Sequence, residues 1–539
     1  MNRRNFHAIN TAPRQSLRGA TNAPSSSIKP LATAVTLAMV AFSQPSLAAN
    51  CIWNPVTGNW GTAGDWTCGL VPGGADSATV AATKTVTINS AQSILNLTNA
   101  GSVNIDAFLL TLNGGGGTTN TGTINVGAGP NPNNAALNIG TGHNVTNTGG
   151  TINVSADSVI NQFGSTISGG TINTTGTGKL AVFSSSANFL DSVTLGGRMD
   201  MASVANSRQR VTNGLTLNNA TVDINQNGIL SFENTQTLSG TGSIVFGNTG
   251  AGNRIDLDGN GTTTIASGVT IRGHSGTIGQ QINIGGTQTL VNNGLISADV
   301  SGGTIGFVDS AVVNNGTLRA INGGTLVLST NVTGGASGQI VAGAGSQVLQ
   351  NGVTISGTVN TSGGGLFSVV SSFANRLDGV TFNGNMDMAS IANSRQRVTP
   401  GGLVLNGTVN INSNGILSFE DNGTFSGNGT VVFGNTGAGN RIDLDGNGTT
   451  TIASGVTIRG HSGTIGQQIN IGGTQTLVNN GLISADVSGG TIGFVDSAVV
   501  NNGTLRAIND GTWCCRPTSP AAPAARSWPV PAARCCKTV

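Results

Sequence analysis

The sequence contains no tyrosine, and aromatic residues make up only 4% of its 539 residues. Charged residues are also scarce at 8%, whereas glycine occurs 84 times. About a quarter of the residues in an ordinary soluble domain are charged, so this composition is unlike that of such a domain. The few basic residues are dispersed and cannot form the dense positive surface by which proteins bind nucleic acid. We therefore expect no nucleic-acid partner.

The formal net charge of +2 conceals an uneven distribution. Residues 1–49 carry five basic side chains and no acidic one, and residues 513–539 carry four basic and no acidic ones. Removing these nine from the total of 23 leaves 14 basic against 21 acidic side chains in residues 50–512, a net charge of −7. The central part of the chain is therefore weakly acidic.

Residues 1–48 have the pattern of an export signal. A basic leader ends at Lys29, an apolar stretch covers Leu31–Phe42, and Ser46 and Ala48 are small residues suited to cleavage after Ala48. The apolar stretch is too short to span a bilayer. We therefore expect an exported protein.

Cysteine is rare, and four of the six cysteines fall within residues 513–539. The remaining two, Cys51 and Cys68, directly follow the predicted cleavage site. Export favours a disulfide between them, worth about 3 kcal/mol for a loop of this size. Two free thiols are the alternative. A metal site is disfavoured, because no histidine lies near them in the sequence.

The most informative feature is a long internal repeat. Val245–Asn322 and Val432–Asn509 are identical at an offset of 187 residues, and Met199–Thr212 recurs with little change as Met386–Thr399. A fixed period is the signature of a repeat architecture, in which each unit needs only to stack on the next. This favours an extended surface over a single asymmetric active site.

Shorter repeats lie within the long one. Gly149–Val154 recurs 20 residues later as Gly169–Thr174, and Val291–Ile296 recurs 22 residues later as Val313–Leu318. Apolar residues alternate with Thr, Ser and Asn between Asn and Gly corners, as in short strands with one buried face. This predicts an all-β fold, a right-handed parallel β-helix (solenoid) of roughly 20 coils with a tandem 187-residue super-repeat. Separate β-sandwich domains are the structural alternative.

Three of the five tryptophans, Trp53, Trp60 and Trp66, lie close together near the predicted start of the mature chain. With Val71-Pro72 and Asp76–Val80, this segment resembles the Trp-rich N-terminal segment of bacterial autotransporter and haemagglutinin-like β-helix passengers. The resemblance implies an adhesin passenger anchored by a C-terminal outer-membrane β-barrel, which is not recognisable here. Large aromatic residues can close the open end of a β-stack. Sugar binding by these rings is the alternative.

The repeat breaks at Trp513. Where the first copy continues with Leu326–Val353, the second continues with Trp513–Val539. Plausible GC-rich codons for Leu326–Val353, read one base out of frame, encode the observed residues and then a stop codon. We interpret residues 513–539 as a frameshift-derived tail, expected to be disordered, on a truncated second copy. An authentic Pro/Ala/Cys tail is the alternative.

The predicted organisation follows from these patterns. It comprises a signal peptide (1–48), a Trp-rich, disulfide-closed cap (49–74), β-helix coils (75–165), the first super-repeat copy (166–352), the truncated second copy (353–512) and the tail (513–539).

Two short segments match the first half of a calcium loop, with oxygen ligands at alternate positions and a glycine at the sixth. At the twelfth position, however, they have Ser267 and Ser454 instead of glutamate. Polar corners of a coil are therefore favoured, and no metal or cofactor is assigned. The weak calcium candidates are Asp256, Asp258 and Asn260, and their copies Asp443, Asp445 and Asn447.

The nearest grouping of acids is Glu233 with Asp256 and Asp258, echoed by Glu420, Asp443 and Asp445. Paired carboxylates converging in a groove are what glycoside hydrolysis requires, but a duplicated catalytic centre would be unusual, so no catalytic residue is assigned. Basic residues are densest at Ala205–Arg210 and Ala392–Arg397, where two arginines share a strand face. These could hold an acidic glycan or form a solvated face with ion pairs. His274 and His461, at one repeat position, are expected to be solvated.

We therefore expect an exported, surface-associated β-helical passenger that acts as an adhesin or structural rod through multivalent binding and is not an enzyme. Its expected partner is a host or bacterial surface glycan or protein. The full-length protein is expected at the cell surface or secreted, and a chain without its barrel in the periplasm. A polysaccharide-acting β-helix enzyme, lyase or hydrolase, is the alternative. A two-partner secreted haemagglutinin has only Asn131-Pro132-Asn133 in its favour.

Overall fold

The computed structural model describes residues 48–129, 134–280, 286–467 and 473–515. The chain forms two units, Met1–Leu47 and Ala48–Val539, and only the second contains described residues. The predicted signal peptide up to Leu47 and the tail from residue 516 therefore lie outside them. The one helical element among the described residues is a 3-10 turn at Ala63–Asp65, and these residues include no helix long and apolar enough to cross a membrane.

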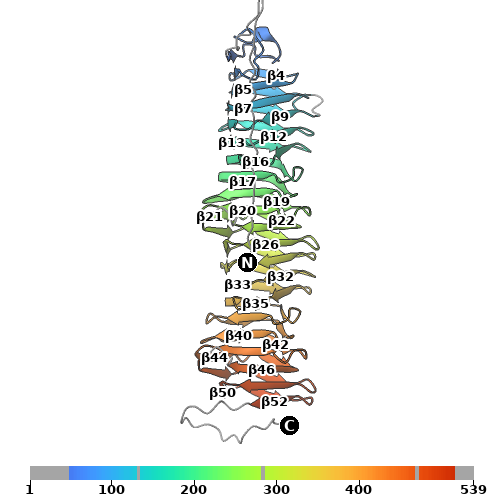
Figure 1. Ribbon diagram of the computed structural model, residues 1–539, viewed down its shortest axis with the longest axis vertical. Coiled ribbons are helices and arrows are strands. Elements are labelled where there is room, and N and C mark those ends of the chain that lie inside the picture. The colour runs from blue at the N-terminus through green and yellow to red at the C-terminus, as the bar shows by residue number, and fades with distance from the viewer. Residues whose placement is uncertain (1–47, 130–133, 281–285, 468–472, 516–539) are drawn as a thin grey trace, which may run out of the picture. The chain divides into compact units, whose positions relative to one another are not determined.

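The second unit is a parallel β-solenoid of about 19 turns, as the sequence predicts. All 52 strands assigned in the described residues join one sheet system, and Figure 1 shows them stacked from β4 (Thr85–Ile88) to β52 (Thr512–Cys515). Each strand pairs in parallel with a strand one coil away, as β11 (Thr151–Val154) does with β8 (Thr123–Val126). The β-sandwich alternative is wrong, since sandwich sheets are antiparallel.

Alternation of side chains explains why these segments form coils. In β8 the inward Ile124 and Val126 are fully buried, and Ile152 and Ile172 stack beneath Ile124 on the next two coils. Each such side chain contributes about 1.5–3 kcal/mol by leaving water. Corners between strands use left-handed backbone, as at Asn322 with φ 56°, a conformation that asparagine and glycine tolerate.

Asparagine ladders form a second stabilising element. On one outward face the side chains of Asn104, Asn125, Asn153 and Asn173 are linked by amide hydrogen bonds of 2.8, 2.8 and 3.4 Å. Each amide both donates and accepts, so one residue type can satisfy its equivalents above and below. A buried ladder of the same kind links Asn99, Asn120 and Asn147.

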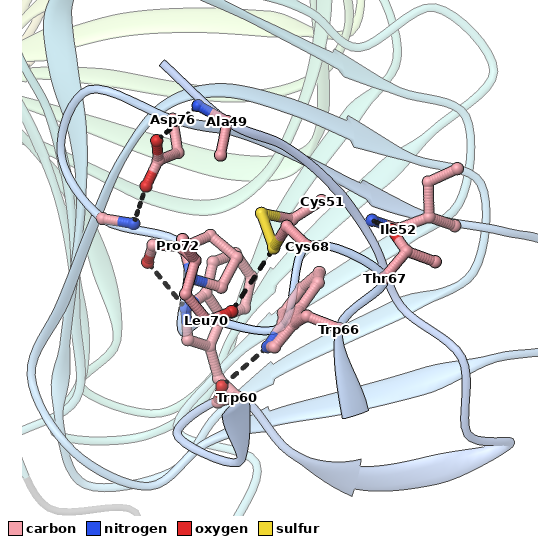
Figure 2. Close-up of a disulfide and its surroundings, with 11 residues drawn as sticks. Ala49, Cys51, Ile52, Trp60, Trp66, Thr67, Cys68, Leu70, Pro72 and Asp76 are labelled. Atoms are coloured by element: carbon pink, nitrogen blue, oxygen red, sulfur yellow. Dashed lines mark hydrogen bonds between the residues drawn. A yellow bond between two sulfur atoms is a disulfide. The ribbon is translucent and has the colours of Figure 1, made fainter. Parts of the chain in front are cut away.

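The first coil is closed by the Trp-rich segment (Figure 2). Trp53, Trp60 and Trp66 are at most 2% exposed, and Trp66 packs edge-on against both other rings. Trp66 Nε1 donates a 2.8 Å hydrogen bond to the carbonyl of Trp60, and a disulfide joins Cys51 to Cys68. Because the rings are buried, they cannot stack on a sugar. They extend the solenoid core at its N-terminal end.

A coil comprises three strand segments, as where β18 is followed by the two halves of β19, so equivalent segments form three columns along the solenoid. The first column runs through β18 (Ile229–Glu233), β20 (Arg254–Asp258), β23 (Gly276–Gly279), β26 (Thr304–Val308), β29 (Thr325–Leu328), β32 (Gln347–Gln350), β34 (Leu366–Val369), β36 (Asn385–Met388) and β39 (Thr408–Ile411).

The second column contains the repeat equivalents of β18 and β20, which are β40 (Ile416–Glu420) and β43 (Arg441–Asp445). Toward the N-terminus this column ends at the first half of β19 (Gln236–Phe246). Between β40 and β19 it contains β37 (Arg395–Val398), β35 (Arg376–Asn383), β33 (Thr354–Thr361), β30 (Val332–Gly334), β27 (Ala311–Asn314), β24 (Gln288–Asn292) and β21 (Gly261–Ile265).

The two copies therefore occupy different columns. From β18 the first column takes eight coil steps to reach β39, and β40 is the next strand of the chain. The 187-residue period thus spans eight coils and one further strand. Identical sequences consequently lie on different faces of the solenoid, which the repeat length alone did not reveal.

The copies also differ locally. In the first copy β17 (Arg208–Ile224) is continuous, whereas its equivalent is divided into β37, β38 (Leu403–Leu405) and β39. The corner Asn213-Gly214 of the first copy is Pro400-Gly401-Gly402 in the second, one residue longer. Proline has no amide hydrogen for the strand ladder, so the strand is interrupted there.

The last described strand corrects the prediction for the first three residues of the tail, 513–515. Residues 513–539 were expected to be disordered, yet Trp513, Cys514 and Cys515 continue β52 and pair with β49 (Thr491–Val495). Trp513 lies opposite Ile492, as Leu326 lies opposite Ile305 in the first copy. The parallel ladder needs only an extended backbone, and tryptophan supplies the apolar side chain that this position requires.

Candidate functional site: a duplicated arginine–carboxylate cluster

Three features of the sequence lie together on one surface of the solenoid. They are the basic segment Ala205–Arg210, the acid grouping around Glu233, and the calcium-like loop that begins at Asp256. β17, β18 and β20 are consecutive in the first column, with Arg210 beside Ser231 and Ser231 beside Asp256. We call the resulting set the charge cluster. In the first copy it consists of Arg208, Arg210, Glu233, Arg254, Asp256 and Asp258; in the second, of Arg376, Arg395, Arg397, Glu420, Arg441, Asp443 and Asp445.

Strand alternation places these side chains outside the apolar core. Leu230 and Phe232 of β18 and Ile255 and Leu257 of β20 point inward and are at most 1% exposed. The intervening residues therefore point outward. Even so, Asp256 is fully buried and Asp258 only 3% exposed. Such burial of outward carboxylates requires charged partners.

Arginines of the first copy provide these partners. Arg254 Nε lies 2.6 Å from Asp256 Oδ1, and an Arg208 terminal nitrogen lies 3.4 Å from Asp258 Oδ2. Arg210 pairs with Glu233. The Arg210 guanidinium also lies 4.5 Å from the centre of the Phe189 ring, within range of a cation–π interaction. Three arginines thus balance three carboxylates.

The second copy repeats this arrangement. Arg441 Nε is 2.5 Å from Asp443, and a terminal nitrogen of Arg395 is 3.3 Å from Asp445. Arg397 Nε lies 2.5 Å from Glu420 Oε1.

A fourth arginine distinguishes this second cluster. Arg376, which replaces Phe189 of the first copy, has its Nε 3.3 Å from Glu420. The formal charge of the cluster is therefore zero in the first copy and +1 in the second. Arg376 could have been found from the sequence, because the first copy has Phe189 at the equivalent position.

Burial raises the pKa of Asp256 and Asp258 and of their copies Asp443 and Asp445. In each case nearby arginines act in the opposite direction, without overcoming the loss of hydration. A raised folded pKa means that these four carboxyl groups stabilise the fold at low pH, and that this contribution is lost as the pH rises through their folded pKa.

Asp200, one coil before Asp223, behaves differently. Burial raises its pKa, but hydrogen bonds from Lys179, Ser203 and two backbone amides lower it to about 2. Lys179 Nζ lies 2.6 Å from its carboxylate. In the second copy Leu366 replaces Lys179, and Ser368 donates a 3.4 Å hydrogen bond to Asp387 instead. No sequence motif marks the pair of Lys179 and Asp200, because its two residues lie 21 positions apart on neighbouring coils.

The calcium candidates are engaged within the protein. Asp256 and Asp258 face arginines, while Asn260 Oδ1 accepts a 2.8 Å hydrogen bond from the amide of Thr287. In the second copy Asp443 and Asp445 face arginines likewise, and Asn447 Oδ1 accepts a 2.9 Å bond from Thr474. In the part of the chain that the structure describes, no three His, Cys, Asp or Glu side chains are grouped to hold a metal ion.

The histidines at the repeat position contact a neighbouring serine. His274 Nδ1 lies 2.7 Å from the hydroxyl of Ser275, and His461 Nδ1 lies 2.7 Å from that of Ser462. Another histidine, His143, was overlooked and is fully buried between Thr118 and the carbonyl of Asn113. Burial lowers its pKa, so its role is to bridge coils as a neutral ring.

The fold and this site define the chain as a parallel β-solenoid with a duplicated arginine–carboxylate cluster. No family model matches the chain, and no curated protein sequence is similar to it. Among solved structures, the crystal structure of a TibC-catalysed, hyper-glycosylated fragment of TibA aligns with 86% of this chain and 100% of that one. The identity is 14% and the TM-score 0.18, too low for the match to support a function.

Proposed function

We propose that this chain is an exported, surface-associated β-solenoid that acts as an adhesin or structural rod through repeated contacts. The observation that carries the proposal is the duplication of one outward surface, Val245–Asn322 and Val432–Asn509, on a continuous ladder of coils. The export pattern of residues 1–48 and the resemblance of the Trp-rich segment to autotransporter passengers support it. The partner would be a surface glycan or protein.

The two copies lie in different columns, and this arrangement bears on whether they can bind one surface or two. Because the copies lie on different faces, two equivalent contacts cannot both meet one flat surface. They suit bridging, in which each copy holds a separate partner. Avidity arises only when the geometry allows both sites to engage at once, so we expect stronger attachment between two surfaces than to one.

A deletion variant tests this function. Residues 199–385 are removed so that Arg198 joins Met386, which keeps the local sequence and register because Met199 and Met386 are equivalent. The full chain is expected to cross-link beads coated with cell-surface material, whereas the single-copy variant binds beads without cross-linking them. Equal cross-linking by both proteins contradicts bridging. Absence of attachment by the full chain to cells, glycans and surface proteins contradicts the adhesin role.

The enzymatic alternative has one observation in its favour, the proximity of Glu233 to Asp256 and Asp258. These carboxylates are paired with arginines, and Asp256 is buried, so we propose that they are structural. Glu233→Gln and Asp256→Asn are expected to leave polysaccharide samples unchanged, as wild type does. Release of reducing ends by wild type and its loss in both variants would establish the enzyme instead.

The truncation is likewise a proposal. Sequencing across codons 510–514 tests it. Recovery of Leu-Val-Leu-Ser after one added base, followed by further coils, is the expected result. A confirmed sequence in the present frame excludes a sequencing error and leaves either a frameshift carried by the gene itself or an authentic tail.

A further inference from the structure

A hollow beside the first charge cluster carries an inference that goes beyond the proposed function, because it concerns a single ligand site in the first copy and not the duplicated surface. Three successive corners between the first and second columns, at Ser192, Asn213-Gly214 and Thr235, open into a space of about 520 Å³. We call this space the corner groove. Its lining consists of Ser192, Asn213, Gly214, Thr216, Thr235, Gln236, Thr237 and Ser239.

Backbone conformation creates the groove. Ser192, Asn213 and Gly214 have φ values of 56°, 54° and 92°, and the pairing of β16 (Phe189–Met201) with β17 shifts register between Asp191 and Val193. These left-handed corners turn the chain sharply between the columns. The outward side chains of Thr216 and Ser239 then line one side of the hollow.

The lining favours an uncharged, hydroxyl-rich ligand. Seven of the eight lining residues carry a hydroxyl or amide, and none is charged. The Thr216 and Ser239 hydroxyls lie 2.9 Å apart, and each retains further capacity to donate or accept. Sugar hydroxyls have the same dual capacity, whereas an anionic ligand would find no cation in the lining and a lipid would require an apolar one.

The lining positions of the groove recur on successive coils. Its residues come from three consecutive coils, spaced about 4.8 Å apart. An extended chain of β-linked sugars presents hydroxyls at a comparable spacing, so it can contact equivalent positions on successive coils. We propose that the corner groove binds a segment of a neutral oligosaccharide lying along the solenoid axis.

The second copy supplies a natural comparison. At the positions equivalent to Ser192, Thr216 and Gln236 it has Gly379, Val404 and Gly423. Among the lining residues with a polar side chain, only Thr237 and Ser239 have retained equivalents, Thr424 and Ser426. The groove chemistry is therefore specific to the first copy, and the substitutions found in the second copy are compatible with the fold.

The test uses the full chain, an array of neutral and charged oligosaccharides, and titration calorimetry with the best neutral ligand. Thr216→Val introduces the second-copy residue, and Ser239→Ala removes the facing hydroxyl. Together they are expected to weaken binding about tenfold or more, since two hydrogen bonds are lost. The matched control, Ser426→Ala, is expected to bind as wild type does. Thermal unfolding of each variant verifies the fold.

Other outcomes would contradict the proposal that the corner groove binds a neutral oligosaccharide. These are unchanged affinity in the Thr216→Val/Ser239→Ala variant, equal weakening by Ser426→Ala, and binding of only charged glycans or only peptides. If the full chain still cross-links coated beads in those cases, the adhesin function stands and the groove alone is wrong. If the chain neither attaches nor binds any oligosaccharide, both proposals fail.

Discussion

At Asp200 a lysine helps to keep a buried carboxylate ionised, so this residue stabilises the fold near neutral pH and loses that effect in strong acid. Its folded pKa of about 2 lies below the ordinary aspartate value of 3.8. A depressed folded pKa contributes stability above the unfolded pKa, and this stability is lost as the pH falls from about 4 to 2. In the second copy Leu366 stands at the position of Lys179, so Asp387 lacks this lysine.

Lys179→Leu introduces the second-copy residue and tests this account. We expect a loss on the order of 1–2 kcal/mol at pH 7 that shrinks as the pH falls toward 2. Urea unfolding at several pH values measures it. Arg198→Leu is the control: Arg198 is 44% exposed beside Asp223, and its loss is expected to be much smaller. Equal, pH-independent losses would contradict the role assigned to Lys179.

The charge cluster has the opposite pH dependence. Removing one arginine from a buried pair leaves an uncompensated carboxylate, which costs about 3–5 kcal/mol. We expect Arg254→Ala to lower the unfolding midpoint strongly at pH 7 and less at pH 4, where the raised pKa of Asp256 allows it to take up a proton. Arg272→Ala, at a half-exposed arginine, should have a small effect at both pH values. Loss of stability that is greatest at pH 4 would reverse this assignment.

At the scale of elements, the two ends of the described solenoid differ in how their apolar core is covered. The N-terminal coil buries three tryptophans and is closed by a disulfide. Each coil contacts only its neighbours, so a change in the cap should act locally.

Replacing both Cys51 and Cys68 by serine tests this locality. We expect a loss of about 3 kcal/mol, on the chain-entropy account, confined to the first coils. Hydrogen exchange should accelerate in β1 (Asn50–Ile52) and β3 (Ser77–Val80), which pair directly, and remain slow in β40 and β43. Uniform acceleration along the whole chain would mean that the solenoid unfolds as one cooperative unit.

The C-terminal end shows what an additional coil would contribute. Val499, Leu505 and Ala507 pack only partly against the core. Their first-copy equivalents, Val312, Leu318 and Ala320, are at most 1% exposed, because β30, β31 (Gln339–Ala342) and β32 follow them. The repeat itself therefore identifies the segment that fits this end.

Replacing residues 513–539 by the sequence of Leu326–Val353 should cover that end. We expect a higher thermal midpoint and less binding of an apolar dye than in the present chain. A scrambled segment of the same composition is the control. If both segments stabilise equally, the effect is not due to coil stacking.

At the scale of the whole solenoid, the phase of the repeat decides on which face each copy lies. Eight coils and one further strand separate equivalent residues, so each copy is turned by one column relative to the last. A repeat of a whole number of coils would have placed both clusters on one face, suited to attachment to a single surface. The observed phase favours bridging.

The sequence by itself determined the class of fold, because inward aliphatic residues, outward polar residues and Asn or Gly corners recur at short range. It also determined the repeat, and it pointed to the pairing of Cys51 with Cys68. These features depend on local pattern, where composition and spacing carry the physical information. The predicted export signal and the frameshift remain predictions.

Only the tertiary structure decided which outward residues meet. Arg210, Glu233 and Asp256 are separated by about one coil each, and the lengths of the intervening corners set their register. The same holds for the corner groove, whose residues come from three coils, and for the rotation between copies. Small variations in corner length accumulate along the chain, so a period of 187 residues fixes the position of a residue in the sequence but not the face on which it lies.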